Sequence, residues 1–160
     1  MNVGIDAASF YIPNLYLPIR DLAEARGIEP AKLEKGLGLL KMSLNDVNED
    51  TATLAANALL KLMQDFKVNP KEVGRIYLGT ESALDASKPT AIYASHMVEQ
   101  KLASEYGERC FAHTDITDIT FACVGGIDAM QNSLDFIRAN PEQKAIVIAA
   151  DYAKYTLAST

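Results

Sequence analysis

Residues 145–150 form an unbroken run of six apolar side chains, AIVIAA. A run of this length with β-branched residues at its centre is typical of a strand that is covered on both faces. A shorter apolar strand is predicted at residues 75–79, and segments with helical patterns lie between and around the two. This alternation of strands and helices predicts an α/β layered domain with a largely buried mixed sheet.

Apolar residues recur at helical spacing in the longer segments between the strands. The clearest is residues 49–66, where Leu54, Ala58 and Leu62 fall on one face. Asn69 and Pro70 then stop the helix. Further helices are predicted at residues 89–105 and 124–139, short helices at 21–26 and 30–35, and extended segments at 3–11 and 110–122.

The charge balance argues against nucleic acid as a partner. The 160 residues carry 21 acidic and 15 basic side chains, a formal net charge of −6, whereas a phosphate backbone is normally bound by a basic face. A single phosphorylated small molecule stays compatible with this charge. No apolar run reaches the roughly 18 residues that cross a bilayer, and no signal peptide is visible. We therefore expect a soluble cytoplasmic protein without a membrane partner.

The two cysteines, Cys110 and Cys123, are both expected to be free thiols in a reducing cytosol. Cys123 lies where an extended run turns into a helix that begins near Val124. Unpaired amides and the helix dipole stabilise a thiolate at such a position, which favours a nucleophile. Gly125 and Gly126 follow at once, and small residues allow a substrate to approach the backbone closely. A buried structural cysteine in a tight junction is the alternative.

Glu81 follows the predicted strand 75–79, near the strand ends where α/β proteins gather their sites. A partly shielded carboxylate there can act as a general base, and a solvated loop acid is the alternative. His96 is expected to be a packing or surface residue of a helix. His113 precedes Cys123 in the extended run, so a cysteine–histidine pair stays open. No metal-ligand spacing and no glycine-rich phosphate motif occurs.

Five stretches of the chain resemble hydroxymethylglutaryl-CoA synthase, a family of the thiolase-fold superfamily. They occur in the family's order and are distributed over nearly the whole chain. Each stretch is weak evidence alone, but the ordered set is specific for the family. Related ketoacyl synthases share the cysteine but lack the glutamate, so Glu81 separates the two families. The stretches are residues 21–27 (DLAEARG), 36–38 (GLG), 79–82 (GTES), 122–123 with 125–126 (AC and GG) and 150–155 (ADYAKY).

The resemblance implies roles for individual residues. Cys123 matches the family's nucleophile, which forms an acetyl-enzyme, and Glu81 matches its general base. Lys32 matches a position that contacts CoA, and Ser159 one near the acyl or pantetheine chain. The implied reaction joins acetyl-CoA and acetoacetyl-CoA to give hydroxymethylglutaryl-CoA for mevalonate synthesis, with no cofactor besides these substrates. Val124 departs from the family, which usually has an aromatic residue there, and this alters the shape of the pocket.

The resemblance also implies a thiolase-like layered fold with a mixed, five-stranded type of sheet covered by helices. Residues 1–160 would form its amino-terminal domain, incomplete at the C-terminus. The family continues beyond Thr160 into a second half that supplies the catalytic histidine, and neither His96 nor His113 matches that histidine. The missing half or a partner chain would then supply it, and a homodimer is implied.

Two other interpretations stay open. The first is a polyketide β-branching synthase, which performs the same chemistry on an acyl chain bound to a carrier protein. The second is a catalytically incomplete fragment or interaction subunit that needs a partner to fold.

Overall fold

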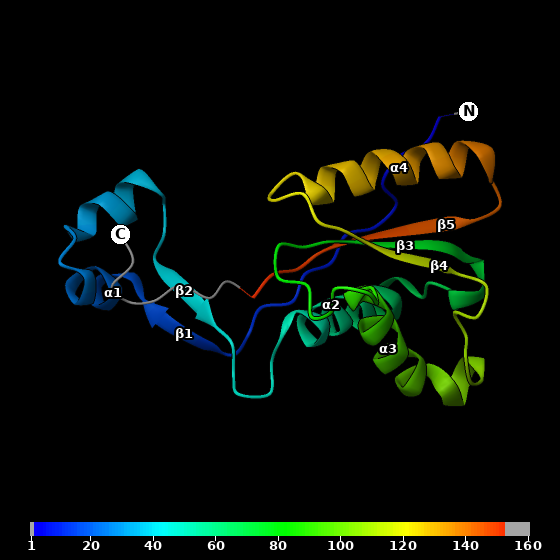
Figure 1. Ribbon diagram of the computed structural model, residues 1–160, viewed down its shortest axis with the longest axis horizontal. Helices are drawn as coiled ribbons and strands as arrows, with labels where there is room; N and C mark the ends of the chain where they lie inside the picture. Colours follow the sequence, from blue (N-terminus) through cyan, green and yellow to red (C-terminus); the bar gives the residue numbers. More distant parts are fainter. Residues whose placement is uncertain (1, 153–160) are drawn as a thin grey trace. The chain divides into compact units, whose positions relative to one another are not determined.

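The computed structural model of the protein describes residues 2–152 (Figure 1). These residues fall into two compact units, which we call unit 1 (residues 2–11 and 50–151) and unit 2 (residues 12–49 and 152). The expectation of one amino-terminal domain over residues 1–160 stays a prediction. In the described part of the chain, no helix has both the length and the apolar character needed to span a membrane.

Unit 1 is built on a parallel sheet of three strands. The central strand β3 (Val73–Gly79) pairs with β4 (Asp115–Ile119) on one side and with β5 (Lys144–Ala149) on the other. The apolar run that predicted a buried strand is β5, in which Ile146 and Ile148 are buried. Because all three strands run in the same direction, their carboxyl ends lie at one edge of the sheet.

Helices cover both faces of this sheet. Helix α4 (Gly125–Ala139) lies on one face, and α2 (Thr51–Phe66) and α3 (Thr90–Tyr106) lie on the other (Figure 1). The core between the sheet and α2 and α3 is formed by fully buried aliphatic side chains, among them Leu59, Ile76, Leu78 and Val98. The prediction of an α/β layered fold is confirmed.

The three long helices begin and end within two residues of the predicted bounds. Helix α2 starts with a capping box, in which Asp50 Oδ1 accepts the Thr53 N–H at 2.8 Å and Thr53 Oγ1 accepts the Asp50 N–H at 2.7 Å. These two bonds satisfy main-chain donors that a helix start leaves unpaired. The chain then turns at Lys67, whose φ of 50° ends the helix in the left-handed region.

Unit 2 contains a small antiparallel sheet and two short helices. Strand β1 (Leu15–Pro18) pairs with β2 (Lys41–Leu44), and α1 (Ile19–Arg26) and η1 (Lys32–Gly36) lie between them in the chain. Helix α1 ends at Gly27, which has a φ of 65°, as the sequence predicted.

The strand predictions need four corrections. The five described strands are divided between a parallel and an antiparallel sheet and do not form one mixed sheet. Residues 3–11 form no strand, and Ile5 and Phe10 are exposed, because strand propensity has no effect without a neighbouring strand to pair with. Of residues 110–122, only β4 is a regular strand. Strands β1 and β2 were missed because a long connection replaces the tight turn of a hairpin.

Candidate active site

The carboxyl ends of the three parallel strands bring three polar segments together. Residues 80–82 follow β3, residues 120–124 join β4 to α4, and Asp151 follows β5. Main-chain bonds fasten the strand ends to each other: the Thr80 N–H donates to Ile119 O at 3.2 Å, and the Ala150 N–H donates to Gly79 O at 3.3 Å. The geometry of a parallel sheet thus places residues from distant parts of the chain at one edge.

Cys123 lies in a tight turn between β4 and α4. The preceding residue, Ala122, has a φ of 42°, in the left-handed region that residues with a Cβ rarely adopt. Val124 is the N-cap and Gly125 the first residue of α4. This turn leaves the Cys123 side chain exposed. The alternative of a buried structural cysteine is therefore wrong.

The amides before α4 are less available than the sequence suggested. The N–H groups of Val124 and Gly125 both donate to the carbonyl oxygen of Phe121 at 3.0 Å. We expected these donors to be unpaired, but the chain makes a hydrogen-bonded turn before α4 and this turn uses them. The exposed apolar side chains of Phe121 and Val124 flank Cys123 in this turn.

The two candidate catalytic side chains are in contact. Cys123 Sγ donates a hydrogen bond to Glu81 Oε1 at 3.4 Å, although the residues are 42 positions apart in the sequence. Glu81 is thus no isolated loop acid: its carboxylate can take a proton from the sulfur or from a group bound to it. A thiol beside a carboxylate at a sheet edge is an arrangement suited to nucleophilic catalysis.

Asp151 holds the loop that carries Glu81. Its Oδ1 accepts hydrogen bonds from Thr80 Oγ1 at 2.9 Å, from the Glu81 N–H at 2.6 Å and from Ser82 Oγ at 2.9 Å. Ser82 is further held by Thr51 at the start of α2, whose hydroxyl donates to Ser82 O at 2.8 Å. Asp151 is a site residue that no predicted role covered, although its position directly after the apolar run of β5 was a signal for it.

Two glycines allow the main chains of β3, β4 and α4 to approach closely. A Cβ on Gly79 would lie 2.4 Å from Gly126 N, and a Cβ on Gly125 would lie 2.7 Å from Ile119 O. Gly126 is different, since its added Cβ would meet Ala149 Cβ at an ordinary 3.5 Å. Close packing against Ile119 therefore explains why position 125 requires glycine. A role of Gly125 and Gly126 in binding substrate stays a prediction.

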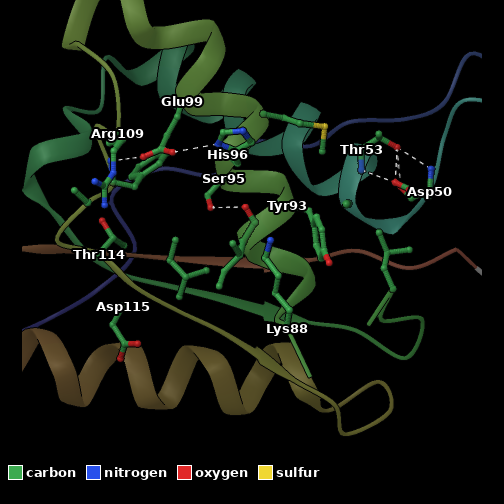
Figure 2. Close-up of a pocket in the computed structure, with 17 residues that line it drawn as sticks. Asp50, Thr53, Lys88, Tyr93, Ser95, His96, Glu99, Arg109, Thr114 and Asp115 are labelled. Carbon is green, nitrogen blue, oxygen red and sulfur yellow. Dashed lines mark hydrogen bonds and ion pairs between the residues drawn. The ribbon is translucent and has the colours of Figure 1, made fainter. Parts of the chain in front are cut away.

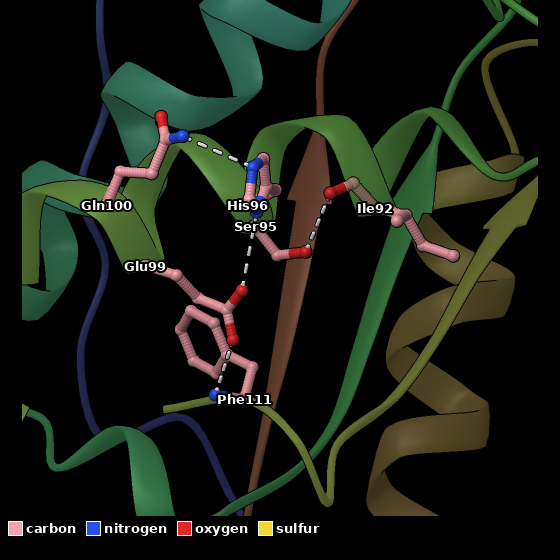
Figure 3. Close-up of polar contacts among 6 residues, drawn as sticks. All are labelled: Ile92, Ser95, His96, Glu99, Gln100 and Phe111. Carbon is pink, nitrogen blue, oxygen red and sulfur yellow. Dashed lines mark hydrogen bonds and ion pairs between the residues drawn. The ribbon is translucent and has the colours of Figure 1, made fainter. Parts of the chain in front are cut away.

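The structure separates both histidines from this pair. His113 precedes the amino end of β4 and Cys123 follows its carboxyl end, and five residues of strand span roughly 16 Å. A pair between His113 and Cys123 is therefore excluded. His96 is a surface residue of α3, with Nδ1 3.7 Å from a Glu99 carboxylate oxygen and Nε2 3.2 Å from Gln100 Nε2 (Figure 3). This confirms the expectation of a surface histidine.

The sequence matched two residues, Lys32 and Ser159, to contacts with CoA. Lys32 is exposed at the start of η1 in unit 2. Ser159 lies outside the described residues. Their roles in binding substrate therefore remain predictions.

A hollow of about 710 Å³ lies along α3 and the segment before and within β4 (Figure 2). Both acidic and basic side chains line it, including Lys88, Glu99, Arg109 and Asp115. Neither Cys123 nor Glu81 lines it. The hollow is therefore separate from the candidate active site.

Comparison with known proteins identifies the family to which this site belongs. The model of the hydroxymethylglutaryl-coenzyme A synthase N-terminal region matches residues 1–160. The chain belongs to the hydroxymethylglutaryl-CoA synthase family. A hydroxymethylglutaryl-CoA synthase from Haloferax volcanii is 38% identical over 157 residues, which cover 96% of this chain and 34% of that protein.

Solved structures agree with this assignment. A structure of MvaS in complex with 3-hydroxy-3-methylglutaryl coenzyme A matches with a TM-score of 0.84 at 35% identity, over 98% of this chain and 35% of that one. A β-ketoacyl-[acyl carrier protein] synthase III from Thermus thermophilus matches at 17% identity with a TM-score of 0.73, over 93% of this chain and 43% of that one. The second likeness concerns the fold alone and supports the thiolase-like class. The chain spans about a third of the hydroxymethylglutaryl-CoA synthases that it matches.

Proposed function

We propose that this chain carries the acyl-accepting site of a hydroxymethylglutaryl-CoA synthase, which joins acetyl-CoA and acetoacetyl-CoA in the mevalonate pathway. The observation that supports this most directly is the hydrogen bond from Cys123 Sγ to Glu81 Oε1 at 3.4 Å. Family membership supports the same chemistry. Apart from its CoA thioester substrates, the proposed reaction uses no cofactor.

In the first step, Cys123 Sγ bonds to the carbonyl carbon of acetyl-CoA. The thiol proton leaves with the CoA thiolate as the thioester bond breaks, so this step does not depend on Glu81. The Cys123 N–H at the start of the helical turn is the proposed donor to the oxyanion that forms during transfer. The product is an acetyl-enzyme with the Glu81 carboxylate beside it.

In the second step, Glu81 removes a proton from the methyl group of the acetyl-enzyme. The resulting enolate carbon bonds to the ketone carbon of acetoacetyl-CoA, and the ketone oxygen takes up the proton that Glu81 removed. Water then cleaves the bond to Cys123, which regenerates the thiol and releases hydroxymethylglutaryl-CoA. In this proposal the histidine that polarises the ketone comes from the rest of the protein or from a partner chain.

The remaining proposals concern substrate contacts and assembly. Lys32 and Ser159 would contact CoA and its pantetheine or acyl chain, and Gly125 and Gly126 would line the approach to Cys123. The enzyme would work in the cytoplasm as a homodimer. These proposals rest on the family resemblance.

Radiolabelled acetyl-CoA tests the scheme. Cys123→Ala should abolish labelling of the protein, whereas Cys110→Ala, which removes the other thiol, should keep it. Glu81→Ala should keep labelling and lose the condensation with acetoacetyl-CoA, because it removes the base and leaves the nucleophile. Labelling of Cys123→Ala at the wild-type level would show that the scheme is wrong. Faster use of an acetoacetyl carrier protein than of acetoacetyl-CoA would overturn the proposed acceptor.

A further inference from the structure

Two carboxylates bind α3 to β4 and to the turn that precedes it. In the turn before the strand, Glu99 Oε1 accepts the N–H of Phe111 at 2.9 Å (Figure 3). At the carboxyl end, Asp118 accepts the N–H of Thr90 at 2.5 Å and that of Ala91 at 3.0 Å, one on each carboxylate oxygen. The first turn of α3 is thus tied to the end of β4 that leads to Cys123.

Asp118 replaces a missing helix cap. The residue at the N-cap position of α3 is Pro89, and no side chain from that position bonds to the helix start. Thr90 and Ala91 are both buried, so their amides need an acceptor within the protein. An ionised carboxylate with two oxygens serves both donors and also matches the positive end of the helix dipole.

The start of α3 in turn holds the loop that carries Glu81. Thr90 is fully buried, and its Oγ1 accepts the N–H of Leu84 at 2.9 Å. The Tyr93 hydroxyl donates to Asp85 Oδ2 at 3.0 Å. The N–H groups of Ser87 and Lys88 also donate to Asp85, and together these bonds lower the Asp85 pKa. The loop after Glu81 is therefore ordered on α3.

The other end of the same loop is held by the neighbour of Asp118. The Thr80 N–H donates to the main-chain oxygen of Ile119 at 3.2 Å. The last two residues of β4 therefore fasten residues 80–90 at both ends, and Cys123 follows four residues later. Glu81 and Cys123 are positioned from the same strand end.

We propose that Asp118 is a positioning residue that sets the distance between the Glu81 carboxylate and the Cys123 sulfur. It touches neither group. It fixes the start of α3, α3 fixes the far end of the Glu81 loop, and β4 fixes the turn that presents Cys123. The roles of Cys123 and Glu81 rest on the proposed function, but the geometric statement about Asp118 can be tested without turnover.

The test is the rate of Cys123 alkylation by iodoacetamide as a function of pH, measured by peptide mass mapping. Glu81→Gln removes a negative charge beside the sulfur, so the rate at neutral pH should rise about fivefold. Asp118→Asn offers one oxygen and one NH₂ where two amides need acceptors, so the loop should loosen and the rate should rise about twofold or more. The double variant should match Glu81→Gln alone, because both changes act on one contact.

Glu99→Gln is the matched control. It weakens a tie of the same kind, between α3 and the turn before β4 and remote from Cys123, and should leave the alkylation profile unchanged even where it lowers the melting temperature. A profile for Asp118→Asn that superimposes on wild type, or rates that add in the double variant, would overturn the inference. If Asp118→Asn does not fold, Thr90→Val replaces it as the test variant. It removes the acceptor for the Leu84 N–H with little change in side-chain size, so it should raise the alkylation rate of Cys123 in the same way.

The acyl-transfer experiment separates this inference from the proposed function. In Asp118→Asn, labelling by acetyl-CoA should persist while the exchange of acetyl methyl protons falls, because the base is displaced and the nucleophile is kept. If the wild-type protein takes no label, the proposed function is wrong, whereas the alkylation profiles still decide whether Asp118 positions Glu81.

Discussion

The Asp151 carboxylate organises the site from outside the reacting pair. One of its oxygens accepts three hydrogen bonds from residues 80–82. Each hydrogen bond to a charged group contributes about 1.5–3 kcal/mol at a site shielded from water and less at an exposed one such as this. Since the Glu81 main chain is bound in this way, its side chain is left to contact Cys123 Sγ.

The two thiols should differ in reactivity. Cys110 is buried, and burial raises the pKa of its thiol, with the Glu99 carboxylate adding to the shift. A raised thiol pKa means less thiolate at neutral pH, so alkylation of Cys110 should become appreciable only as the pH rises or the protein unfolds. At neutral pH, iodoacetamide should modify exposed Cys123 faster by roughly tenfold or more. Peptide mass mapping over a pH series measures both rates, and preferential modification of Cys110 in the folded protein would contradict this.

At the scale of elements, the junction between the sheet and α4 depends on main-chain approach. The start of α4 lies against the ends of β3 and β4, and Gly79 and Gly125 have no room for a side chain. The obstacles are main-chain atoms, which cannot move aside as a flexible side chain can. The position of Cys123 thus depends on the close packing of Gly125, two residues further along the chain, against the strand ends.

The adjacent glycines of α4 offer a matched pair of variants. Gly125→Ala should destabilise the protein by about 1–3 kcal/mol, because its Cβ would lie 2.7 Å from Ile119 O. Gly126→Ala should be neutral or stabilise by up to about 1 kcal/mol, since its Cβ meets an ordinary contact and alanine favours a helix. Urea denaturation measures both free energies of unfolding. Equal effects of the two changes would contradict the packing derived for Gly125.

At the scale of the whole molecule, the site belongs to unit 1 and the chain spans only part of its relatives. It covers 34% of the H. volcanii synthase and 38% of one from Enterococcus faecalis. Cys123, Glu81 and Asp151 all lie in segments that follow the strands of the three-stranded parallel sheet of unit 1. The acyl-accepting half of the proposed reaction thus draws on residues that this chain contains.

The 160-residue chain by itself should therefore perform the first step of the proposed reaction but not the second. We expect acetyl transfer to Cys123 without release of hydroxymethylglutaryl-CoA, because the proposed histidine that polarises the acceptor lies elsewhere. Consumption of acetoacetyl-CoA, followed by its absorbance, checks condensation, and label on Cys123 checks acyl transfer. Multiple turnovers by the 160-residue chain would show that no further histidine is needed.

Local patterns in the sequence determined the long helices, strands β3 and β5, and the placement of Cys123 and Glu81 at strand ends. Helical spacing, proline and asparagine stops, and the apolar run of residues 145–150 act over a few residues, so they can be read without the fold. The ordered set of motifs indicated the family to which the chain belongs. These signals identified the two members of the reacting pair but not their contact.

Only the tertiary structure decided which residues hold that pair. The bonds of Asp151 to residues 80–82 and of Asp118 to α3 join segments 69–71 and 27–28 residues apart. The need for glycine at position 125 comes from the main-chain oxygen of Ile119, the last residue of β4. Residues 3–11 have a strand-like composition but no pairing partner among the described residues. Hydrogen bonds and close packing across strands depend on the arrangement of the sheet, which no local pattern contains.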